Sequence, residues 1–518
     1  MKNKALIVIT LLALLPFLGQ TQSNTFSPYS RYGIGELRQP TFSHNTGMGG
    51  AHIALKPDST MPIFINVGNP ASYALIKLTT LEVGGSFLYS NFKGSNSTSL
   101  KKWGTNFSYG AIGFPIRNNG GACFGVAPYS SVGYETKNIK QEESIGQVEY
   151  NYKGDGGLNK AFIGYGIMPF IKRMGKFRSN YYYTPDSLKV LSHKQYMRRQ
   201  GINKLLSDFS IGFNVNYIFG TIVNTTRVLY PNVNTTIYDN TYRERILNTK
   251  TFTGNFGAQT GISVDSVKDH KGRAHRIESA LQTFKALGVF TTEELKVKKD
   301  SIEASTQLVK RALKQRVKIT FGYFMNLNNS LNVDYTTGVY NYILNGFGQE
   351  ILRDTVFYTP DKKGSIKMPL EQGFGIGLKK GEKLSVVADF AITNWQNFKY
   401  LDETNDLRKS YRIAVGMNFV PEKYAAGRDA FFKRLNYRLG ASYKSGSIYL
   451  NNSYISDYSV SAGIGIPVGI GRLSSMVNIS GQYGFMGSND PTLIKQNYWR
   501  VNFGFTFCDR WFQKYKYD

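Results

Sequence analysis

Hydrophobic and polar residues alternate strictly near the C-terminus. The apolar positions of this stretch are Trp499, Val501, Phe503, Phe505 and Phe507. The positions between them hold Arg500, Asn502, Gly504 and Thr506. Because the side chains of a strand point alternately to its two faces, the pattern predicts a strand with one apolar and one polar face. The same alternation recurs along most of the chain, which is typical of a membrane barrel with lipid outside and water inside.

The alternation divides the chain into fourteen predicted strands, and an even number is usual in bacterial single-chain barrels. Their approximate bounds are 79–90, 105–116, 121–135, 158–169, 209–222, 251–263, 316–342 with a break near Asn328, 366–378, 384–394, 411–419, 435–443, 455–467, 473–485 and 498–508. We therefore expect an all-β fold, a transmembrane antiparallel β-barrel of about fourteen strands within residues 79–512.

An export signal is expected at residues 1–22, where Lys2 and Lys4 precede the apolar run 5–18 and small and polar residues follow. Beyond it, no run reaches the roughly 18 apolar residues of a membrane-spanning helix. Since lipid leaves backbone groups without partners, a closed barrel is the remaining way to span it. The expected location is the outer membrane of a Gram-negative bacterium, in contact with its lipids.

Composition agrees with this class of protein. The chain contains 35 Tyr, 34 Phe and 53 Gly, an excess that suits aromatic girdles and bent strands. Cys123 and Cys508 are too few for a disulfide framework. We expect two free thiols because the strands that hold them lie far apart in the predicted sheet, with a single bridge as the alternative.

The net charge of +28 is concentrated in two segments. Residues 171–204 hold nine Lys and Arg against one Asp, and residues 264–316 hold twelve against seven acidic residues. In an intracellular protein this balance would favour nucleic acid as a partner, but export argues against that. Both segments are read as basic insertions between strands.

The second insertion has helical rather than strand periodicity. In residues 276–288, apolar side chains recur at helical spacing, and Thr291-Thr292-Glu293-Glu294 offers a capping box before residues 295–315. A helical insertion at 264–316 is therefore predicted. A solvated spacer is one interpretation, and a docking surface for a periplasmic or outer-membrane protein partner, shared with 171–204, is the other.

Strand order predicts the end of the barrel at which the insertions emerge. If the N-terminus starts in the periplasm, every link after an even-numbered strand is periplasmic. Three of these links are short, as periplasmic turns usually are: 117–120, 379–383 and 468–472. The same parity places both basic insertions at the periplasmic end.

The segment before the first strand, residues 23–78, is predicted to form a compact hatch. It contains Met48-Gly49-Gly50-Ala51 and Asn69-Pro70-Ala71-Ser72-Tyr73. Glycines at 47, 49 and 50 allow close backbone approach, and Pro70 removes a ladder donor, so the stretch suits a plug better than a strand.

These motifs resemble, in order and spacing, the N-terminal hatch of the FadL family of outer-membrane hydrophobic-compound channels. The resemblance continues at Met368-Pro369, at Asp389 and Trp395, at residues 463–467 and at Tyr483-Gly484. It implies a plugged barrel that takes up long-chain fatty acids or other hydrophobic small molecules and releases them laterally past a kinked strand. The candidate kink is Gly154, Gly156 and Gly157, for which an ordinary glycine loop is the alternative.

The alternation also assigns charged side chains to the lumen. The inward positions are Arg412, Arg438, Arg500, Lys318 and Asp389. A cationic lumen suits the carboxylate headgroup of a ligand, because arginine binds carboxylates through two parallel hydrogen bonds. The alternative is that these charges pair with one another, with Asp389 as a partner, and brace the wall.

Catalytic chemistry has little support in the sequence. The five histidines are scattered, and no nucleophile-elbow, zincin or Cys-x-x-Cys spacing is present. His270 and His275 lie in a polar linker without a nearby cysteine, so no metal site is predicted there. We expect no enzyme activity and no cofactor.

A protein-interaction role is the competing hypothesis. Some barrels similar to FadL, such as the PorV-type subunit of the type nine secretion machinery, hold exported proteins or dock to a translocon, and large insertions favour such a role. A purely structural role is a third possibility. The charged tail 513–518 follows the last strand, so an assembly signal would be the internal series Phe503, Phe505 and Phe507.

Overall fold

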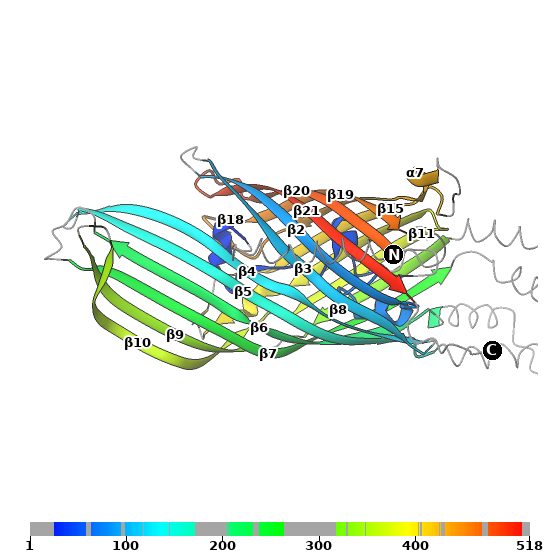
Figure 1. Ribbon diagram of the computed structural model, residues 1–518, viewed down its shortest axis with the longest axis horizontal. Coiled ribbons are helices and arrows are strands. Elements are labelled where there is room, and N and C mark those ends of the chain that lie inside the picture. The colour runs from blue at the N-terminus through cyan, green and yellow to red at the C-terminus, as the bar shows by residue number, and fades with distance from the viewer. Residues whose placement is uncertain are drawn as a thin grey trace, which may run out of the picture.

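The computed structural model describes residues 25–509 except for 58–63, 95–98, 118, 144–145, 171–204, 207, 231–237, 264–316, 328–329, 346, 348, 402, 405–406, 424, 426–429 and 469–474. Within this part, 14 antiparallel strands form a closed barrel (Figure 1). In chain order they are β2 (Thr79–Lys93), β3 (Ser99–Ile116), β4 (Gly120–Glu142), β5 (Gly146–Ile167), β6 (Ser210–Leu229), β7 (Asn240–Ser263), β8 (Val317–Asn326) with β9 (Ser330–Leu344), β10 (Glu350–Lys367) with β11 (Glu371–Lys380), β12 (Leu384–Thr393), β15 (Ser410–Phe419), β16 (Asn436–Lys444), β19 (Ser456–Val468), β20 (Ser475–Gly487) and β21 (Lys495–Asp509).

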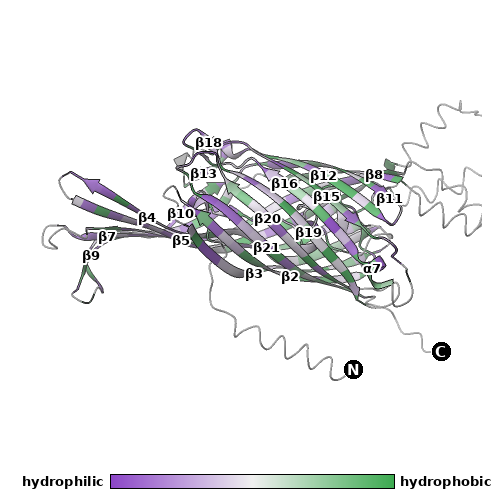
Figure 2. Cartoon of the chain, turned by 90° about the horizontal axis from the view of Figure 1, so that it is seen from above, coloured by the Kyte–Doolittle hydropathy of each residue, from purple (hydrophilic) through white to green (hydrophobic). Residues whose placement is uncertain are grey.

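The first and last strands close the ring. β2 pairs with β21 without interruption from Thr79 opposite Asp509 to Lys93 opposite Lys495. On β21, Phe503, Phe505 and Phe507 are exposed on the outer face, while the side chains between them are buried. Figure 2 shows hydrophobic residues along the barrel strands. The predicted fold class is confirmed, and the apolar outer face is the one suited to lipid.

Two wall strands are each divided by a short break. β8 and β9 both pair with β7, and β11 and β10 pair with β8 and β9 respectively. Each pair of segments therefore counts as one strand of the ring. The break near Asn328 agrees with the prediction. The predicted start of the next strand at 366 was wrong, because β10 begins at Glu350.

Six strands continue past the others at one end of the barrel and form a projecting sheet (Figures 1 and 2). We call this sheet the blade. It comprises residues 132–142, 146–157, 220–229, 240–250, 330–344 and 350–367, paired in the order β4, β5, β6, β7, β9, β10. The opposite end, which holds Thr79 and the links 117–119 and 381–383, is called the short-link end.

The blade explains why several strands were predicted too short. The predicted strands 158–169 and 251–263 begin after their blade portions, and the predicted strands 121–135 and 209–222 stop within the first few residues of theirs. In the blade portion of β10, nearly every residue is exposed, whichever face of the sheet its side chain lies on. Strict alternation is imposed only where one face meets lipid, so a sheet beyond the lipid loses the pattern that revealed the strands.

Residues 25–78 are here called the N-terminal segment, and its described residues, 25–57 and 64–78, lie inside the barrel. Their elements are the 3₁₀-helix η2 (Pro28–Arg31), β1 (Glu36–Leu37), the short α-helix α2 (Ser43–Thr46) and the 3₁₀-helix η3 (Pro70–Leu75). The backbone of Pro70 approaches the inner wall so closely that a Cβ at Gly212 would lie 2.4 Å from its carbonyl oxygen. A closely fitting inner segment is what the glycine-rich wall permits.

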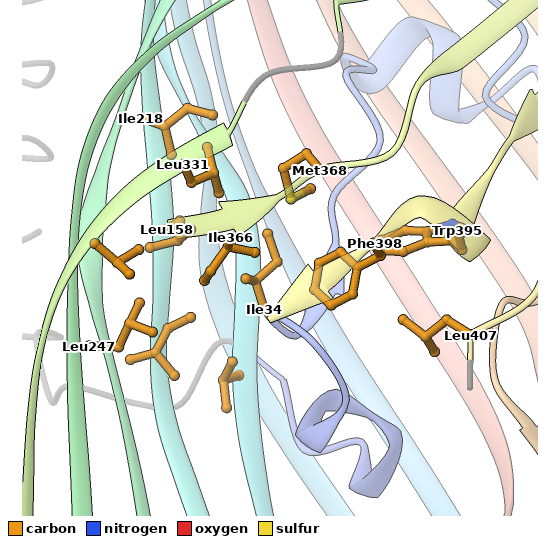
Figure 3. Packing of buried hydrophobic residues seen from close by; sticks show 13 residues of the cluster. Ile34, Leu158, Ile218, Leu247, Leu331, Ile366, Met368, Trp395, Phe398 and Leu407 are labelled. Carbon is orange, nitrogen blue, oxygen red and sulfur yellow. The ribbon is translucent and has the colours of Figure 1, made fainter. Parts of the chain in front are cut away.

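An apolar cluster joins the N-terminal segment to the base of the blade (Figure 3). Ile34 of the N-terminal segment packs in the same buried cluster as Leu158 of β5 and Leu331 of β9. Trp395 and Phe398, on and beside the 3₁₀-helix η4 (Trp395–Asn397), complete the cluster next to β10, with which the following residues Lys399 and Tyr400 pair. This packing fills the lumen where the blade leaves the ring.

The remaining elements lie in links between strands. They are β13 (Lys399–Tyr400), β14 (Glu403–Thr404), α7 (Phe431–Arg434), β17 (Tyr449–Leu450) and β18 (Ser453–Tyr454). None of the described helices is long and apolar enough to cross a membrane.

Candidate functional site: a cationic cavity inside the barrel

A cavity of about 250 Å³ lies between the N-terminal segment and the inner wall. Its lining includes residues 27–50 of the N-terminal segment and inward-facing residues of β3, β4, β16 and β19 to β21. Apolar lining comes from side chains such as Ile34, Phe42 and Leu88, beside many hydroxyl and amide groups. The cavity is therefore amphipathic rather than wholly polar or wholly apolar.

Basic side chains outnumber acidic ones in this lining. The basic residues are Arg38, Lys160, Arg412, Lys444 and Arg500. The acidic residues are Glu36 and Asp457. Glu36 lies 3.9 Å from the Arg500 guanidinium, and the Asp457 carboxylate accepts a hydrogen bond from Tyr498 at 2.9 Å. The two carboxylates thus already have partners near Arg500.

Arg412 and Lys160 are basic residues of this lining that make no close ion pair among the described residues. Arg412 is 8% exposed, and among the described residues its one hydrogen bond is a long one of 3.5 Å from Nη1 to the Gly50 carbonyl. Its Nε has no hydrogen-bond partner. The Lys160 ammonium lies 6.0 Å from the centre of the Phe162 ring. Among the described residues, neither cation has a carboxylate within 4.0 Å, an arrangement able to bind an anion.

His52 does not add to this positive charge. Burial, together with the neighbouring Arg412 guanidinium, lowers the pKa of His52 to about 4. The imidazole is therefore neutral near pH 7, and its Nδ1 lies 2.8 Å from the Gly50 carbonyl oxygen, where a protonated Nδ1 donates. Gly50 thus receives both the Arg412 and the His52 contacts.

Asp389 binds the N-terminal segment rather than lining the cavity. Its buried Oδ2 accepts hydrogen bonds from the backbone amides of His52, at 2.6 Å, and Ile53, at 2.8 Å. With His52 neutral, these amides rather than an imidazolium stabilise the carboxylate. Asp389 is therefore an anchor for the inner segment.

Other wall side chains hold the N-terminal segment in the same way. Gln259 Nε2 donates to the Ile53 carbonyl at 2.8 Å, and Thr320 Oγ1 donates to the Ala54 carbonyl at 3.0 Å. Glu82 of β2 accepts from the Ile65 amide at 3.0 Å, and the same oxygen accepts from Thr506 of β21 at 3.3 Å. Much of the polarity of the lumen serves to satisfy the backbone of the segment inside it.

Arg438 and Lys318 lie away from the cavity. Arg438 is buried and donates to Asn418 at 3.2 Å and to Asn478 at 2.7 Å. Lys318 pairs with Asp208 at 2.8 Å, and Lys56 contacts the same carboxylate at 3.0 Å. Of the five inward charges predicted from sequence, the structure brings only Arg412 and Arg500 into the cavity lining.

The hatch residues singled out from sequence lie at close contacts with the wall. Gly49 has a φ of +68°, and a Cβ there would lie 2.6 Å from the Ala441 carbonyl. The amide of Gly49 donates to Ser461 at 2.9 Å. Asn69 caps η3 by accepting from the Ala71 amide at 3.2 Å, while its Nδ2 donates to the Tyr323 carbonyl at 3.2 Å. Glycine and asparagine are needed here for local geometry and wall contact.

Gly154, Gly156 and Gly157 lie inside β5 instead of in a loop between strands. Gly156 and Gly157 have φ angles of +101° and +152°, yet each is paired with β4 on one side and β6 on the other. The alternative of a glycine loop was wrong. The glycines bend the strand where the blade begins, and the ladder stays continuous across them.

An unpaired stretch of the barrel wall, here called the seam, lies between β3 and β4. Their pairing ends at Gly110 opposite Val126, so from there on the facing edges of the two strands have no ladder between them. β1 of the N-terminal segment pairs with the β4 edge at Ser130 and Ser131. The cavity lining includes residues 106–108 on one side of this seam and Ala127, Pro128 and Ser131 on the other.

Sequence reasoning missed the seam, β1, and the cavity residues Lys160, Glu36 and Arg38. Pro128 was an available signal, because proline within a strand indicates an edge or a bulge, and the β4 register does shift between Pro128 and Ser130. No sequence pattern showed that the edge would be filled by a two-residue strand from the N-terminal segment.

Several sequence predictions lie wholly or partly outside the described residues. They are the export signal 1–22, the insertions 171–204 and 264–316, and the tail 513–518. The strands that flank the insertions are described, and β5 and β6 meet at Ile167 opposite Ile211, at the short-link end. Both insertions therefore connect strands at the end predicted from parity. The membrane side of that end stays a prediction. Among the described residues, no group of His, Cys, Asp or Glu side chains is placed to hold a metal ion.

Comparison with known proteins gave a family match and several structural likenesses. A family model described as BamG matches residues 1–183 and 272–518. No curated protein matches the sequence. A FadL homologue of Pseudomonas aeruginosa has a TM-score of 0.48 at 10% identity, covering 91% of this chain and 99% of that one.

Two toluene transporters are similar at the same level. TbuX of Ralstonia pickettii has a TM-score of 0.46 at 10% identity and covers 91% of this chain and 98% of its own. TodX of P. putida has a TM-score of 0.48 at 10% identity and covers 92% of this chain and 100% of its own.

Replacing Asp389 tests the anchoring of the N-terminal segment. Asp389→Ala removes the acceptor of two buried amides, and a hydrogen bond to a charged group contributes about 1.5–3 kcal/mol. We expect faster amide hydrogen exchange in peptides containing His52 and Ile53. Asp389→Asn, which keeps one acceptor oxygen, should have a smaller effect, and Asp490→Ala, in an exposed link, should have none. Equal exchange in Asp389→Ala and the unmodified protein would contradict this role.

Proposed function

The chain belongs to the BamG family, and from its closed barrel, inner segment and amphipathic cavity we propose that it is an outer-membrane channel for hydrophobic solutes that carry an acidic group. Long-chain fatty acids are the ligand class that fits best. The observation that carries this proposal is the buried Arg412, with an unpartnered Nε, in a cavity that also has apolar lining.

The charge distribution of the cavity favours an amphipathic anion. A buried guanidinium without a carboxylate partner is costly, and an incoming carboxylate would offset that cost. Arg412 offers the geometry of a two-point contact, and Lys160 supplies a second cation in the same lining. Ile34, Phe42 and Leu88 offer apolar contacts for the hydrocarbon part of the ligand.

The N-terminal segment supports the proposed plug. Its backbone is held by Asp389, Gln259, Thr320 and Glu82 on separate wall strands, so displacing it as a whole would break many buried hydrogen bonds at once. Passage straight through the barrel is therefore unfavourable. A route that leaves most of these contacts intact is preferable.

Lateral release at the seam between β3 and β4 is such a route. The cavity already touches both sides of the seam. Among the described residues, the open edge of β4 is held by the two-residue strand β1, by the backbone amide of Arg38 and by the hydroxyl of Ser30. Outward-facing Phe107 and Phe124 on either strand are exposed on the lipid side. We place the proposed lateral opening here rather than at Gly154, Gly156 and Gly157.

Selectivity for the acid group tests the ligand proposal. We expect the purified protein to bind dodecanoate more tightly than dodecanol, measured by calorimetry. Arg412→Gln should reduce dodecanoate affinity about tenfold or more, as loss of a charged hydrogen bond predicts, and leave dodecanol unchanged. Arg353→Gln, on the blade, is the matched control and should preserve the preference. Equal affinities for acid and alcohol in the unmodified protein would reject the proposal.

Locking β1 to β4 tests the lateral route. Leu37 and Ser130 are register partners, so Leu37→Cys with Ser130→Cys should form a disulfide across the seam. Cells carrying the oxidised variant should take up labelled dodecanoate more slowly, and a reductant should restore the rate. Leu439→Cys with Ala462→Cys, register partners on β16 and β19 outside the cavity lining, should have no effect. Unimpaired uptake with the lock closed would exclude this route.

A protein-interaction role is the second candidate function, and the blade favours it. The hairpin of β9 and β10 exposes Leu344, Phe347, Ile351, Leu352, Val356, Phe357 and Tyr358. Phe347 alone is 92% exposed. At about 3.3 Å per residue, Ile351 lies roughly 50 Å along the strand from Lys367, where β10 leaves the ring, so lipid does not explain this patch.

Copurification distinguishes the two functions. If the blade binds a partner, a protein that copurifies from native membranes should be lost with Phe347→Ser and Phe357→Ser. Ile139→Ser, an exposed apolar residue on β4 at the other edge of the blade, should retain it. Dodecanoate binding should be unchanged in all three variants. If the partner still copurifies with both phenylalanine variants, the blade is not its binding site.

A further inference from the structure

Helix α7 presents two adjacent aromatic side chains to the surroundings of the barrel. It consists of Phe431, Phe432, Lys433 and Arg434 and lies at the short-link end (Figure 1). Phe432 is 69% exposed, and its ring lies 5.4 Å from that of Phe431 in an edge-to-face arrangement. Exposing the apolar surface of a phenylalanine ring to water is unfavourable, so a pair of exposed rings indicates an apolar binding partner.

The helix lies on the outer side of the wall. Tyr437 of β16 stands in register between Phe419 of β15 and Ile464 of β19, both exposed on the outer face. The Tyr437 hydroxyl donates a hydrogen bond to the Phe432 carbonyl at 3.0 Å. Because Tyr437 points outward, this bond holds α7 over the lipid-facing surface and not over the lumen.

The link that carries α7 is held in place at several points. Val420 donates to the Lys383 carbonyl at 2.8 Å, which ties the link to the neighbouring short link 381–383. Glu422 donates to the Lys433 carbonyl at 2.8 Å. Ala430 and Leu435, on either side of the helix, are buried. The two phenylalanine rings are therefore displayed by a fixed turn.

Two basic residues follow the aromatic pair directly. Lys433 is exposed, and Arg434 Nε is without a hydrogen-bond partner. Among the described residues, neither Lys433 nor Arg434 has a carboxylate within 4.0 Å. Aromatic rings at the level of the headgroups, with cations beside them to meet phosphate, are the arrangement of an interfacial anchor.

We propose that α7 binds the phospholipid headgroup layer of the leaflet at the short-link end. Phe431 and Phe432 insert at the boundary between headgroups and acyl chains, and Lys433 and Arg434 contact the phosphates. Phospholipid is favoured over a protein because α7 is continuous, through Tyr437, with the lipid-facing belt of Phe419 and Ile464. The anchor fixes the depth of the barrel on this side of the membrane.

A fluorescent probe at Phe432 tests the insertion. Cys123 and Cys508 are buried, so the thiol of Phe432→Cys reacts preferentially with an environment-sensitive dye. The labelled full-length protein is placed in phosphatidylethanolamine and phosphatidylglycerol vesicles with brominated acyl chains. We expect strong quenching by bromine and severalfold weaker quenching by aqueous iodide than for the same dye at Phe347→Cys, on the blade.

The outcomes against the proposal are equally distinct. Iodide quenching at position 432 as strong as at position 347, with no quenching by brominated lipid, would overturn it. If iodide quenches the probe at position 432 in vesicles but not in native membranes, α7 binds a protein partner, and the lipid proposal is also overturned.

The charged residues are tested separately. Lys433→Gln with Arg434→Gln should reduce bromine quenching at position 432 in vesicles containing phosphatidylglycerol and should have no effect in pure phosphatidylcholine. Equal quenching with and without the two cations in both kinds of vesicle would overturn the phosphate contacts. Heat-modifiability on gels, unchanged in these variants, confirms that the barrel itself is folded.

Discussion

Lipid offers no hydrogen-bond partner to a peptide group, and this constraint governs the rest of the structure. It requires every wall strand to be paired on both sides, so the ring closes through β2 and β21. Where the constraint ends, the strands behave differently. Beyond the lipid, six strands leave the ring as a sheet with free edges. Within the wall, the seam between β3 and β4 past Gly110 and Val126 is an exception to the pairing, and β1 of the N-terminal segment pairs with the β4 edge there.

A second constraint follows inside the ring. A chain segment placed in the lumen has its own backbone groups to satisfy, and wall side chains supply the partners. Asp389 and Glu82 each bind backbone amides of the N-terminal segment, and Gln259 binds its carbonyls. An inward charge in this barrel is thus more often a structural partner than a ligand contact. Arg412 stands out because it has only one long contact of this kind.

The strands that face lipid could be predicted from the sequence, whereas the parts of the fold that do not face lipid could not. Alternation around Phe503 to Phe507 marked a strand correctly, and counting such stretches gave the number of wall strands. The same logic failed for β10, whose blade portion has no lipid to enforce a pattern. Alternation also assigned both Arg438 and Arg412 to the lumen. Only the structure distinguishes them, because Arg412 contacts the Gly50 carbonyl beside the cavity, whereas Arg438 donates to Asn478 and braces the wall.

The contact at Glu82 has a consequence for assembly. One carboxylate oxygen joins the N-terminal segment through Ile65, the first wall strand through its own backbone and the last wall strand through Thr506. The full set of contacts at Glu82 therefore exists only when the inner segment is seated and the two ends of the sheet have met. Ring closure and seating of the inner segment are thus coupled, because each adds a hydrogen bond to the same buried oxygen.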